Sequence, residues 1–238
     1  MFLFSQKRKR FFLKYCRFVA APVADANTRR QTAEMPRIPS PALLLAAALV
    51  TAQAALPPPP AAPEVTEMTE LFDRLCLRLF PDNAALNAAA RDYKRMTAAQ
   101  VRQYLHDDPG WGWYLTTAMA TYAITIEAPP YRACAVRRMT PSGFATLRPY
   151  LDAVEAYAAT RRPAILRPPI EQTGKTPDGA DITAFARQLY PRGATRPTEA
   201  FMMLMTDYHG TFRGDLAQDA AGGAGIEIRL VHQFVPPQ

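Results

Sequence analysis

The sequence is poor in the residue types that most enzymes use as nucleophiles and metal ligands. Among its 238 residues there are three histidines and three cysteines, and beyond residue 54 there is a single serine, Ser142. Ser142 stands in Pro-Ser-Gly-Phe rather than in the Gly-x-Ser-x-Gly turn that presents a hydrolase nucleophile. A helix start explains this serine more simply, so the sequence does not favour a serine hydrolase.

Glycine is also uncommon, and the glycines present do not match a phosphate-binding loop. Gly174-Lys175-Thr176 resembles the end of a P-loop, but Pro169 stands where that motif requires glycine, and Pro177 prevents the helix that should follow. The glycines within residues 222–225 precede an expected strand, which is the position of a hairpin loop rather than of a dinucleotide site. We therefore predict no nucleotide and no other cofactor.

No apolar run in the chain is long enough to cross a bilayer comfortably. The longest, within residues 41–56, covers about 15 residues against the roughly 20 that a span needs. Arg37 precedes it, and Ala52-Gln53-Ala54 supplies the small-x-small pattern that signal peptidase reads. We predict that residues 35–54 are a cleavable signal peptide and that the mature chain starts near Ala55 in the periplasm, without a stable membrane span. A transmembrane helix and a buried core helix are the alternatives.

A signal peptide begins at the initiating methionine, and Met35 stands at that place. We therefore interpret residues 1–34 as an upstream extension that is disordered and not part of the working protein. One alternative is a twin-arginine export motif at residues 9–14, which has lysine in place of the first arginine and lacks a nearby apolar segment. The other is a basic disordered tail.

Removal of residues 1–54 also removes the chain's positive charge. The whole chain has 28 Lys and Arg against 21 Asp and Glu, and this leader contains nine and two of them, which leaves 19 of each sign. A net charge of +7 would favour nucleic acid or an anionic surface as a partner, but the mature chain is formally neutral. The pairs Arg137-Arg138 and Arg161-Arg162 lack interleaved aromatic residues. We interpret them as solvated faces or strand edges and predict no nucleic-acid partner.

Cys76 and Cys134 are the two cysteines that remain, and an oxidising compartment favours a disulfide between them. Cys76 lies on the apolar stripe of an expected helix, and Cys134 shares one face of an expected strand with Val136. A helix packed on that strand would bring the two sulfurs together. A catalytic or metal-binding thiolate is the alternative. Neither cysteine has a Cys-x-x-Cys partner or a nearby histidine, so no metal site is predicted.

Residues 65–238 are predicted to form a single α+β domain after a proline-rich tether at residues 55–64. Helices come first, then a strand pair, a helix, and three or more further strands, which indicates an antiparallel sheet covered on one face by helices. The expected helices are 71–80, 84–96, 97–105 and 140–157, the last kinked at Pro149. The expected strands are 121–127, a segment around Cys134, 182–190, 200–208 and 226–235.

Asp207 and His209 are the first candidates for chemistry. On a strand both side chains project to the same face, so the carboxylate could orient the imidazole as a general base. Glu127 or Asp215 could act as the acid partner. The alternative is that the strand ends at Gly210 and that both side chains are solvated.

Trp111, Trp113 and Tyr114 form the densest aromatic group and include the only two tryptophans. If they are exposed, their rings would suit stacking against a carbohydrate or a peptide. If they are buried, they would anchor a helix to the sheet. We keep them as binding candidates that depend on their exposure.

The signal peptide, the two cysteines and the Tyr131-x-x-Cys134-x-Val136 strand resemble the layout of small exported proteins of unknown function from Gram-negative alphaproteobacteria. The resemblance covers most of residues 35–160 and implies a periplasmic location without an assigned chemistry. We therefore expect a non-catalytic module that binds a small molecule, a peptide or an envelope component. The alternative is a small hydrolase or transferase that uses Asp207 and His209.

Overall fold

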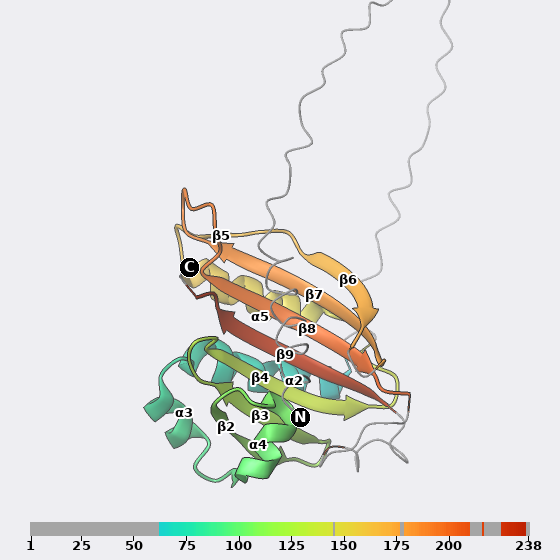
Figure 1. Cartoon of the computed structure of the whole chain (residues 1–238). Coiled ribbons are helices and arrows are strands. Elements are labelled where there is room, and N and C mark those ends of the chain that lie inside the picture. The colour runs from blue at the N-terminus through green and yellow to red at the C-terminus, as the bar shows by residue number, and fades with distance from the viewer. Residues whose placement is uncertain (1–61, 145, 177–178, 210–215, 217–224, 237–238) are drawn as a thin grey trace, which may run out of the picture. The chain divides into compact units, whose positions relative to one another are not determined.

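Nine strands form one antiparallel sheet in the computed structural model of the protein, which describes residues 62–144, 146–176, 179–209, 216 and 225–236. The strands are β1 (Lys94–Arg95), β2 (Gly110–Thr116), β3 (Thr121–Glu127), β4 (Ala133–Thr140), β5 (Ile165–Leu166), β6 (Ile170–Lys175), β7 (Asp181–Tyr190), β8 (Glu199–Asp207) and β9 (Ile226–Phe234). Their order is β1-β2-β3-β4-β9-β8-β7-β5, and β6 also pairs with β7 (Figure 1). The extension predicted at residues 1–34, the predicted signal peptide and Asp215 lie outside the described residues.

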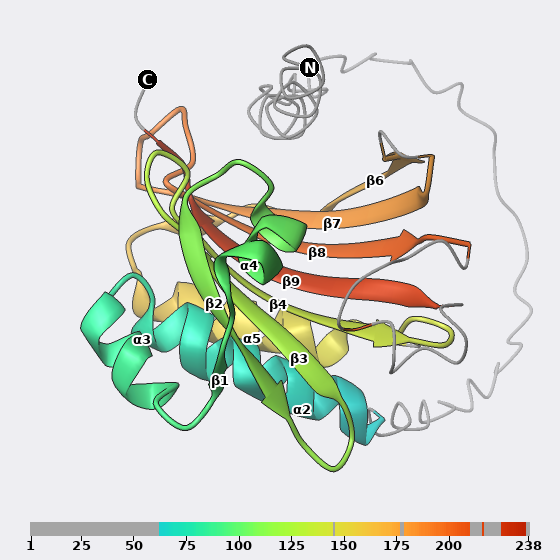
Figure 2. The same cartoon turned by 60° about the horizontal axis from the view of Figure 1, so that its bottom comes forward.

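Helices lie against both faces of this sheet, but unequally. They are α2 (Pro63–Phe72), the π-helix η1 (Asp73–Leu79) that continues it, α3 (Asn83–Ala89), α4 (Ala98–Leu105) and α5 (Arg148–Thr160). Figure 2 shows α2, α3 and α5 on one side of the sheet and the short α4 on the other. The predicted α+β fold with an antiparallel sheet is therefore confirmed. In the described ranges, no helix combines the length and the apolar character needed to span a membrane.

The main core lies between the sheet and α2, η1 and α5. Alternate side chains of the central strands point into it, among them Ile124 of β3, Val136 of β4 and Leu230 of β9, which are all fully buried. Val154 of α5 and Phe72 of α2 close the core from the helical side. Because strand side chains alternate, the residues between these apolar positions face the opposite side of the sheet, where α4 lies.

The chain reaches α4 through a capping box that the sequence predicts. The Thr97 hydroxyl accepts a hydrogen bond from the Gln100 amide at 3.3 Å, and the Gln100 side-chain oxygen accepts one from the Thr97 amide at 2.9 Å. Gly112 of β2 then lets the chain before α4 pack against the sheet. A Cβ at this position would lie 2.8 Å from the Met96 sulfur and would collide with the Ile124 carbonyl oxygen.

A disulfide joins Cys76 of η1 to Cys134 of β4, as predicted, with the two Cα atoms 5.3 Å apart. Beside it, the His232 ring of β9 donates from Nδ1 to the Cys76 carbonyl oxygen at 2.7 Å. Its Nε2 lies 2.8 Å from the Glu199 carboxylate of β8. The bridge and this histidine together attach η1 to three adjacent strands.

Three predicted helices have the wrong bounds. The helix expected over residues 71–80 begins already at Pro63, within the predicted tether, and continues as η1 to Leu79. The helix expected over residues 84–96 ends at Ala89, because the chain then forms β1 and pairs with β2. The helix expected from Thr140 begins only at Arg148, because β4 stays paired with β9 through Thr140. Pro149 consequently lies in the first turn of α5, where its missing N–H costs no hydrogen bond, and not at a kink.

Candidate functional site

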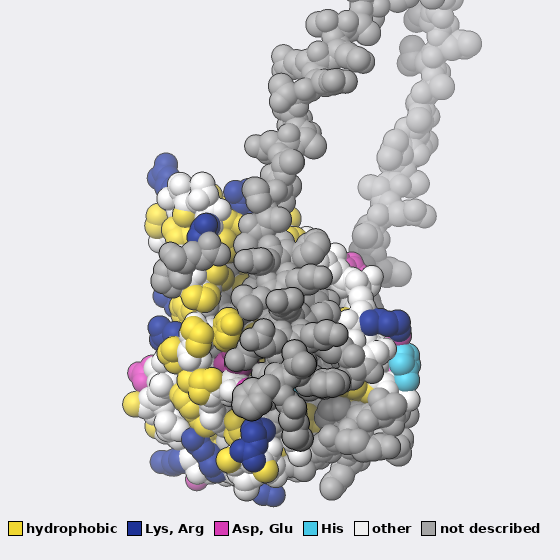
Figure 3. Space-filling view, in the orientation of Figure 1, with side chains coloured by type: hydrophobic (Ala, Val, Ile, Leu, Met, Phe, Trp, Pro, Cys, Tyr) yellow, Lys and Arg dark blue, Asp and Glu magenta, His cyan; other side chains and the backbone are white. Residues whose placement is uncertain are grey.

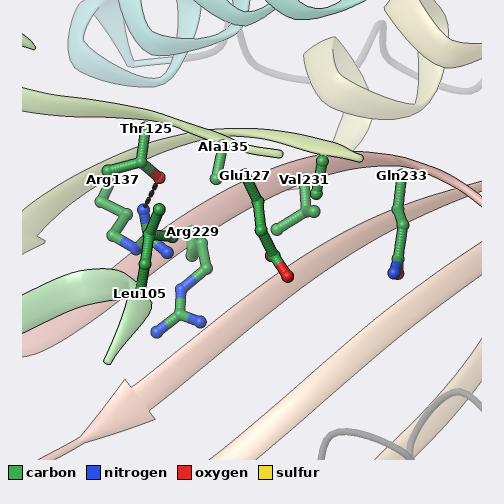
Figure 4. Close-up of a pocket in the computed structure, with 9 residues that line it drawn as sticks. Leu105, Thr125, Glu127, Ala135, Arg137, Arg229, Val231 and Gln233 are labelled. Carbon is green, nitrogen blue, oxygen red and sulfur yellow. Dashed lines mark hydrogen bonds between the residues drawn. The ribbon is translucent and has the colours of Figure 1, made fainter. Parts of the chain in front are cut away.

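Arg137 of β4 and Arg229 of β9 occupy directly opposite positions on neighbouring strands. Both lie on the sheet face that carries α4, and with Leu105 of α4 they line a hollow that we call the arginine pocket (Figure 4). Like charges that face each other across a strand pair destabilise the sheet unless other groups compensate them. The contacts of the two guanidinium groups therefore decide what the pocket can do.

Arg137 is almost wholly buried, with 3% of its surface exposed. Its Nη1 donates a hydrogen bond to the Thr125 hydroxyl, and the Tyr104 ring lies 5.2 Å from the guanidinium carbon. Its Nε lies 3.3 Å from Glu227 Oε1. This geometry makes an ion pair without a hydrogen bond, so Nε is a buried donor that has no hydrogen-bond acceptor among the described residues.

Glu227 is the carboxylate that both guanidinium groups share. It precedes Arg229 by two residues on β9 and accepts hydrogen bonds from Arg229 Nη2 at 3.2 Å and 3.4 Å. The Tyr208 hydroxyl donates a further one at 2.8 Å. Glu227 is 3% exposed in its side chain whereas Arg229 is 17% exposed, so Arg229 is the group that still reaches the pocket's opening.

All three of these groups are charged at neutral pH. Burial works to raise the pKa of Glu227, but Arg229 and Arg137 outweigh it and hold that pKa below its usual value. Burial, and then repulsion by Arg229, lower the pKa of Arg137 to about 10. Burial also acts to lower the pKa of Arg229, but the charge of Glu227 reverses this and raises it. Two cations and one anion leave one positive charge.

Glu127, at the end of β3, lines the same pocket and is only partly exposed. Figure 4 shows its carboxyl group on the same side of the sheet as Arg229 and Gln233. Burial, and then the charge of Asp108, raise the pKa of Glu127 to about 7, although Arg137 and Arg229 oppose the shift. Glu127 is thus largely neutral in mildly acidic solution and negative in alkaline solution, and the net charge of the pocket changes with it.

Apolar side chains form the floor between these charged ends. Ala135 lies directly opposite Val231, and Ala133 lies opposite Gln233, one pleat further along the two strands. The hollow encloses only about 20 Å³, which is room for about one water molecule. Below about pH 7, where Glu127 is largely neutral, the pocket has a net positive charge, and it suits at most a very small anion.

Asp207 and His209 lie close together, but not through strand alternation: β8 ends at Asp207, and His209 lies in the turn that follows, with φ +49° and its amide donating to Asp207 Oδ1 at 2.8 Å. His209 Nδ1 lies 3.4 Å from Asp207, and Nε2 lies 2.8 Å from Asp181 of β7. Hydrogen bonds from Lys175 and His209 lower the pKa of Asp181. The whole cluster is solvent-accessible, and both ring nitrogens face carboxylates, whereas a general base needs a nitrogen that can accept a substrate proton.

Glu127 does not join this cluster. Successive cross-strand pairs join Glu127 to Ala133, Ala133 to Gln233, and Gln233 to Ala200, which is near the beginning of β8. Asp207 is at the other end of that strand. The two ends are about 23 Å apart at the rise of an extended strand. The acid partner that the sequence suggested therefore belongs to the arginine pocket.

Of the three aromatic binding candidates, Trp113 and Tyr114 are buried, at 3% and 6% exposure. The Trp113 ring packs in the main core under the Arg95 guanidinium, and Tyr114 faces α4. Trp111 is partly buried against the main core. These residues anchor β2 to its neighbours and offer no shared aromatic surface.

Sequence reasoning missed the arginine pair. The interpretation of Arg137-Arg138 as solvated or at a strand edge is wrong, since these residues are 3% and 7% exposed and β4 lies in the middle of the sheet. A signal was present: Glu227 and Arg229 alternate with apolar residues in one expected strand, and Arg137 alternates with Ala135 in another. Which strands would become neighbours was not visible from the sequence.

No protein-family model, curated protein or solved structure matches this chain. Within the described ranges, no three His, Cys, Asp or Glu residues lie close enough together to hold a metal ion. On the described part of the face seen in Figure 3, Lys and Arg side chains are spread around the rim and do not form one continuous patch. Among the described features, the arginine pocket is the one on which we base a proposed function.

Proposed function

We propose that this protein is an exported binding protein that holds a small anion between Arg137 and Arg229 and does no chemistry on it. The observation that carries the proposal is that two facing guanidinium groups share one carboxylate, Glu227. A positive charge in a largely buried place is costly unless an anion accompanies it. A bound anion would compensate that charge at Arg229, the guanidinium group that is still partly exposed.

Two separate observations support the proposal that the protein is exported. The disulfide between Cys76 and Cys134 is of the kind that persists in oxidising compartments, since the cytosol keeps thiols reduced. Residues 35–54 have the basic start, the apolar centre and the small-residue cleavage pattern of a signal peptide. Together they favour a protein that works in the periplasm.

A hydrolase or transferase at His209 is the weaker alternative. The His209 ring lies between Asp181 and Asp207 in a solvent-accessible cluster, and each of its nitrogens faces a carboxylate of the protein. The described residues around it belong to strand ends and do not line the arginine pocket. These observations favour the arginine pair over His209 as the site of the proposed function.

Isothermal titration of the full, oxidised chain with sodium acetate at constant ionic strength tests the proposal. We expect saturable binding near one equivalent. Arg229→Gln should weaken it about tenfold or more, because it removes a charge-assisted hydrogen bond. Arg229→Lys should be intermediate, because lysine keeps the charge but loses the planar fork.

Arg192→Gln is the matched control, because it makes the same charge change at an exposed turn after β7. It should bind acetate as the parent chain does. If acetate, chloride and sulfate all fail to bind the parent chain, or if the two glutamine variants bind equally, the proposed function is wrong.

A further inference from the structure

We infer that the preferred ligand of the arginine pocket is a monatomic halide such as chloride, which lies in the hollow beside Arg229 and Glu127. This inference rests on the proposed function and names its ligand class. Three features of the pocket lead to it: the size of the hollow, its net charge and the kinds of groups that line it.

The hollow has room for a single small particle. It encloses about 20 Å³, which is enough for about one water molecule. Its floor offers no further space, because Ala135 and Val231 are only 5% and 6% exposed. A chloride ion is slightly larger than a water molecule, whereas acetate and sulfate each contain several heavy atoms. A halide can therefore enter the hollow, and a polyatomic anion can contact the pocket only at its mouth.

The net charge of the pocket matches one negative charge when Glu127 is neutral. Arg137 and Arg229 are both cations, and Glu227 lies within ion-pair distance of both and compensates one of them. Glu127 adds no charge in mildly acidic solution, because burial, and then Asp108, raise its pKa to about 7. A halide ion brings the sum to zero, whereas a dianion such as sulfate would exceed it.

The groups around the hollow suit a halide better than a water molecule. Arg229 directs Nε and Nη2 to Glu227, which leaves Nη1 as its donor for a ligand. Leu105, Ala135 and Val231 are apolar and offer no acceptor from their side chains to the hydrogens of a water molecule. A halide has no hydrogens and accepts hydrogen bonds from any direction. A guanidinium group is also weakly hydrated, so its pairing with a halide costs little desolvation.

Glu127 should make halide binding depend on pH. Figure 4 shows its carboxyl group on the same side of the sheet as Arg229. When protonated, this group is a hydrogen-bond donor for the halide, and when ionised it repels the halide. The charged groups that act on Glu127 are Asp108 after α4, Arg137 of β4 and Arg229 of β9. Halide binding should therefore weaken as the pH rises through about 7.

The first test is a titration of the full, oxidised chain with chloride, bromide, acetate and sulfate at about pH 6, where Glu127 is largely neutral. Gluconate, which is too bulky for the hollow, keeps the ionic strength constant. Chloride should bind about tenfold more tightly than acetate, because inside the hollow it gains a hydrogen bond from Glu127 that acetate at the mouth does not make. Sulfate should bind more weakly than chloride. Glu127→Gln should remove the pH dependence of chloride binding, because the amide stays neutral and can still donate.

The second test locates the ion. Bromide can be identified in a crystal by its anomalous X-ray scattering. Crystals of the oxidised chain grown in sodium bromide at about pH 6 should show a peak within hydrogen-bond distance of the Arg229 guanidinium group. Bromide peaks at other places only would overturn the inference.

Val231→Ala should change which anion the pocket prefers. This variant enlarges the hollow, so acetate should enter it and should lose its disadvantage relative to chloride. Val154→Ala is the matched control, because it makes the same change in the main core on the opposite face of the sheet. It should keep the preference of the parent chain for chloride.

The outcomes separate this inference from the proposed function. Acetate binding without chloride binding, or equal affinities for chloride, acetate and sulfate, would overturn the inference and leave the anion site standing. Chloride binding that persists in Arg229→Gln while acetate binding weakens would also overturn it, because the halide would then lie elsewhere. The absence of all anion binding would instead defeat the proposed function itself.

Discussion

At the scale of single residues, Glu227 determines whether the arginine pair can exist inside the sheet. It accepts hydrogen bonds from Arg229 and Tyr208 and lies within ion-pair distance of Arg137. Breaking a buried pair by removing one partner is strongly destabilising, because a desolvated charge is left behind. Glu227 is therefore a structural requirement of the pocket, whereas Arg229 is the residue that can be changed to test binding.

Glu127 should make both stability and ligand binding depend on pH. Burial, and then Asp108, raise its pKa from 4.5 to about 7, so the folded protein keeps a proton that the unfolded chain releases at lower pH. The stability from this proton is complete below about pH 4.5 and is lost as the pH rises through about 7. Glu127→Gln should therefore flatten the pH profile of the free energy of unfolding between about pH 5 and about pH 8.

Urea denaturation across that range measures the effect, with Glu171→Gln on the exposed edge strand β6 as the control. The parent chain should also bind acetate less tightly above about pH 7, because ionised Glu127 then repels the ligand. Identical pH profiles for the parent chain and Glu127→Gln would contradict this prediction.

A second buried polar pair lies on the helical face, between His232 and Glu199. Both ring nitrogens of His232 face acceptors, the Cys76 carbonyl and the Glu199 carboxylate. Burial acts to raise the pKa of Glu199, but hydrogen bonds from His232 and Tyr157 outweigh it and lower that pKa. The His232 ring thus connects η1 to β8, and the Phe201 ring stacks against it with the ring centroids 4.8 Å apart.

At the scale of elements, the disulfide and His232 fasten η1 to the centre of the sheet. The bridge closes a loop with a sequence separation of 58 residues, and both cysteines are fully buried. In a chain-entropy estimate, a loop of this length contributes about 4 kcal/mol to stability. The helices on this face thus depend on a covalent bond as well as on packing.

The double variant Cys76→Ser and Cys134→Ser should lose about 4 kcal/mol of unfolding free energy relative to the oxidised parent. Urea denaturation with and without a reductant measures this loss, and the reductant should destabilise the parent but not the variant. Cys16→Ser is the control, because Cys16 lies outside the described residues and in the predicted extension. A double variant as stable as the oxidised parent would refute the prediction, as would two free thiols in the unreduced parent.

At the scale of the whole molecule, location is the property that most needs a direct measurement. If residues 35–54 are a signal peptide, a Gram-negative host should deliver a periplasmic protein whose intact mass starts at Ala55. A chain that begins at Met35 should be exported equally well. Ala54→Asp should block cleavage, because signal peptidase requires a small residue at that position.

Ala61→Asp provides the matched control, since it adds the same charge within the tether, beyond the cleavage site. It should be processed normally. Recovery of the uncleaved, full-length parent in the cytoplasmic fraction would contradict the export proposal and would also remove one support for the disulfide in the cell.

The sequence predicted much of the fold where a pattern repeats within one element. Period-two alternation placed β3 and β9, β7 and β8 were also expected as strands, and the Thr97 capping box placed α4. It failed where pairing decides the structure. Trp111 to Tyr114 became part of β2, which pairs with β3, and β4 stayed paired with β9 up to Thr140, so no helix begins at that residue.

By itself, the sequence determined the fold class, the pairing of Cys76 with Cys134 and the absence of familiar catalytic spacings, because these follow from local periodicity and composition. Only the tertiary structure decided that Arg137 and Arg229 would face each other. They are 92 residues apart in the sequence, and they lie opposite each other only because β9 pairs with β4 in this register. A shift of one residue would have turned Arg229 to the opposite face of the sheet. A site that consists of cross-strand neighbours can therefore be recognised only when the order and register of the strands are known.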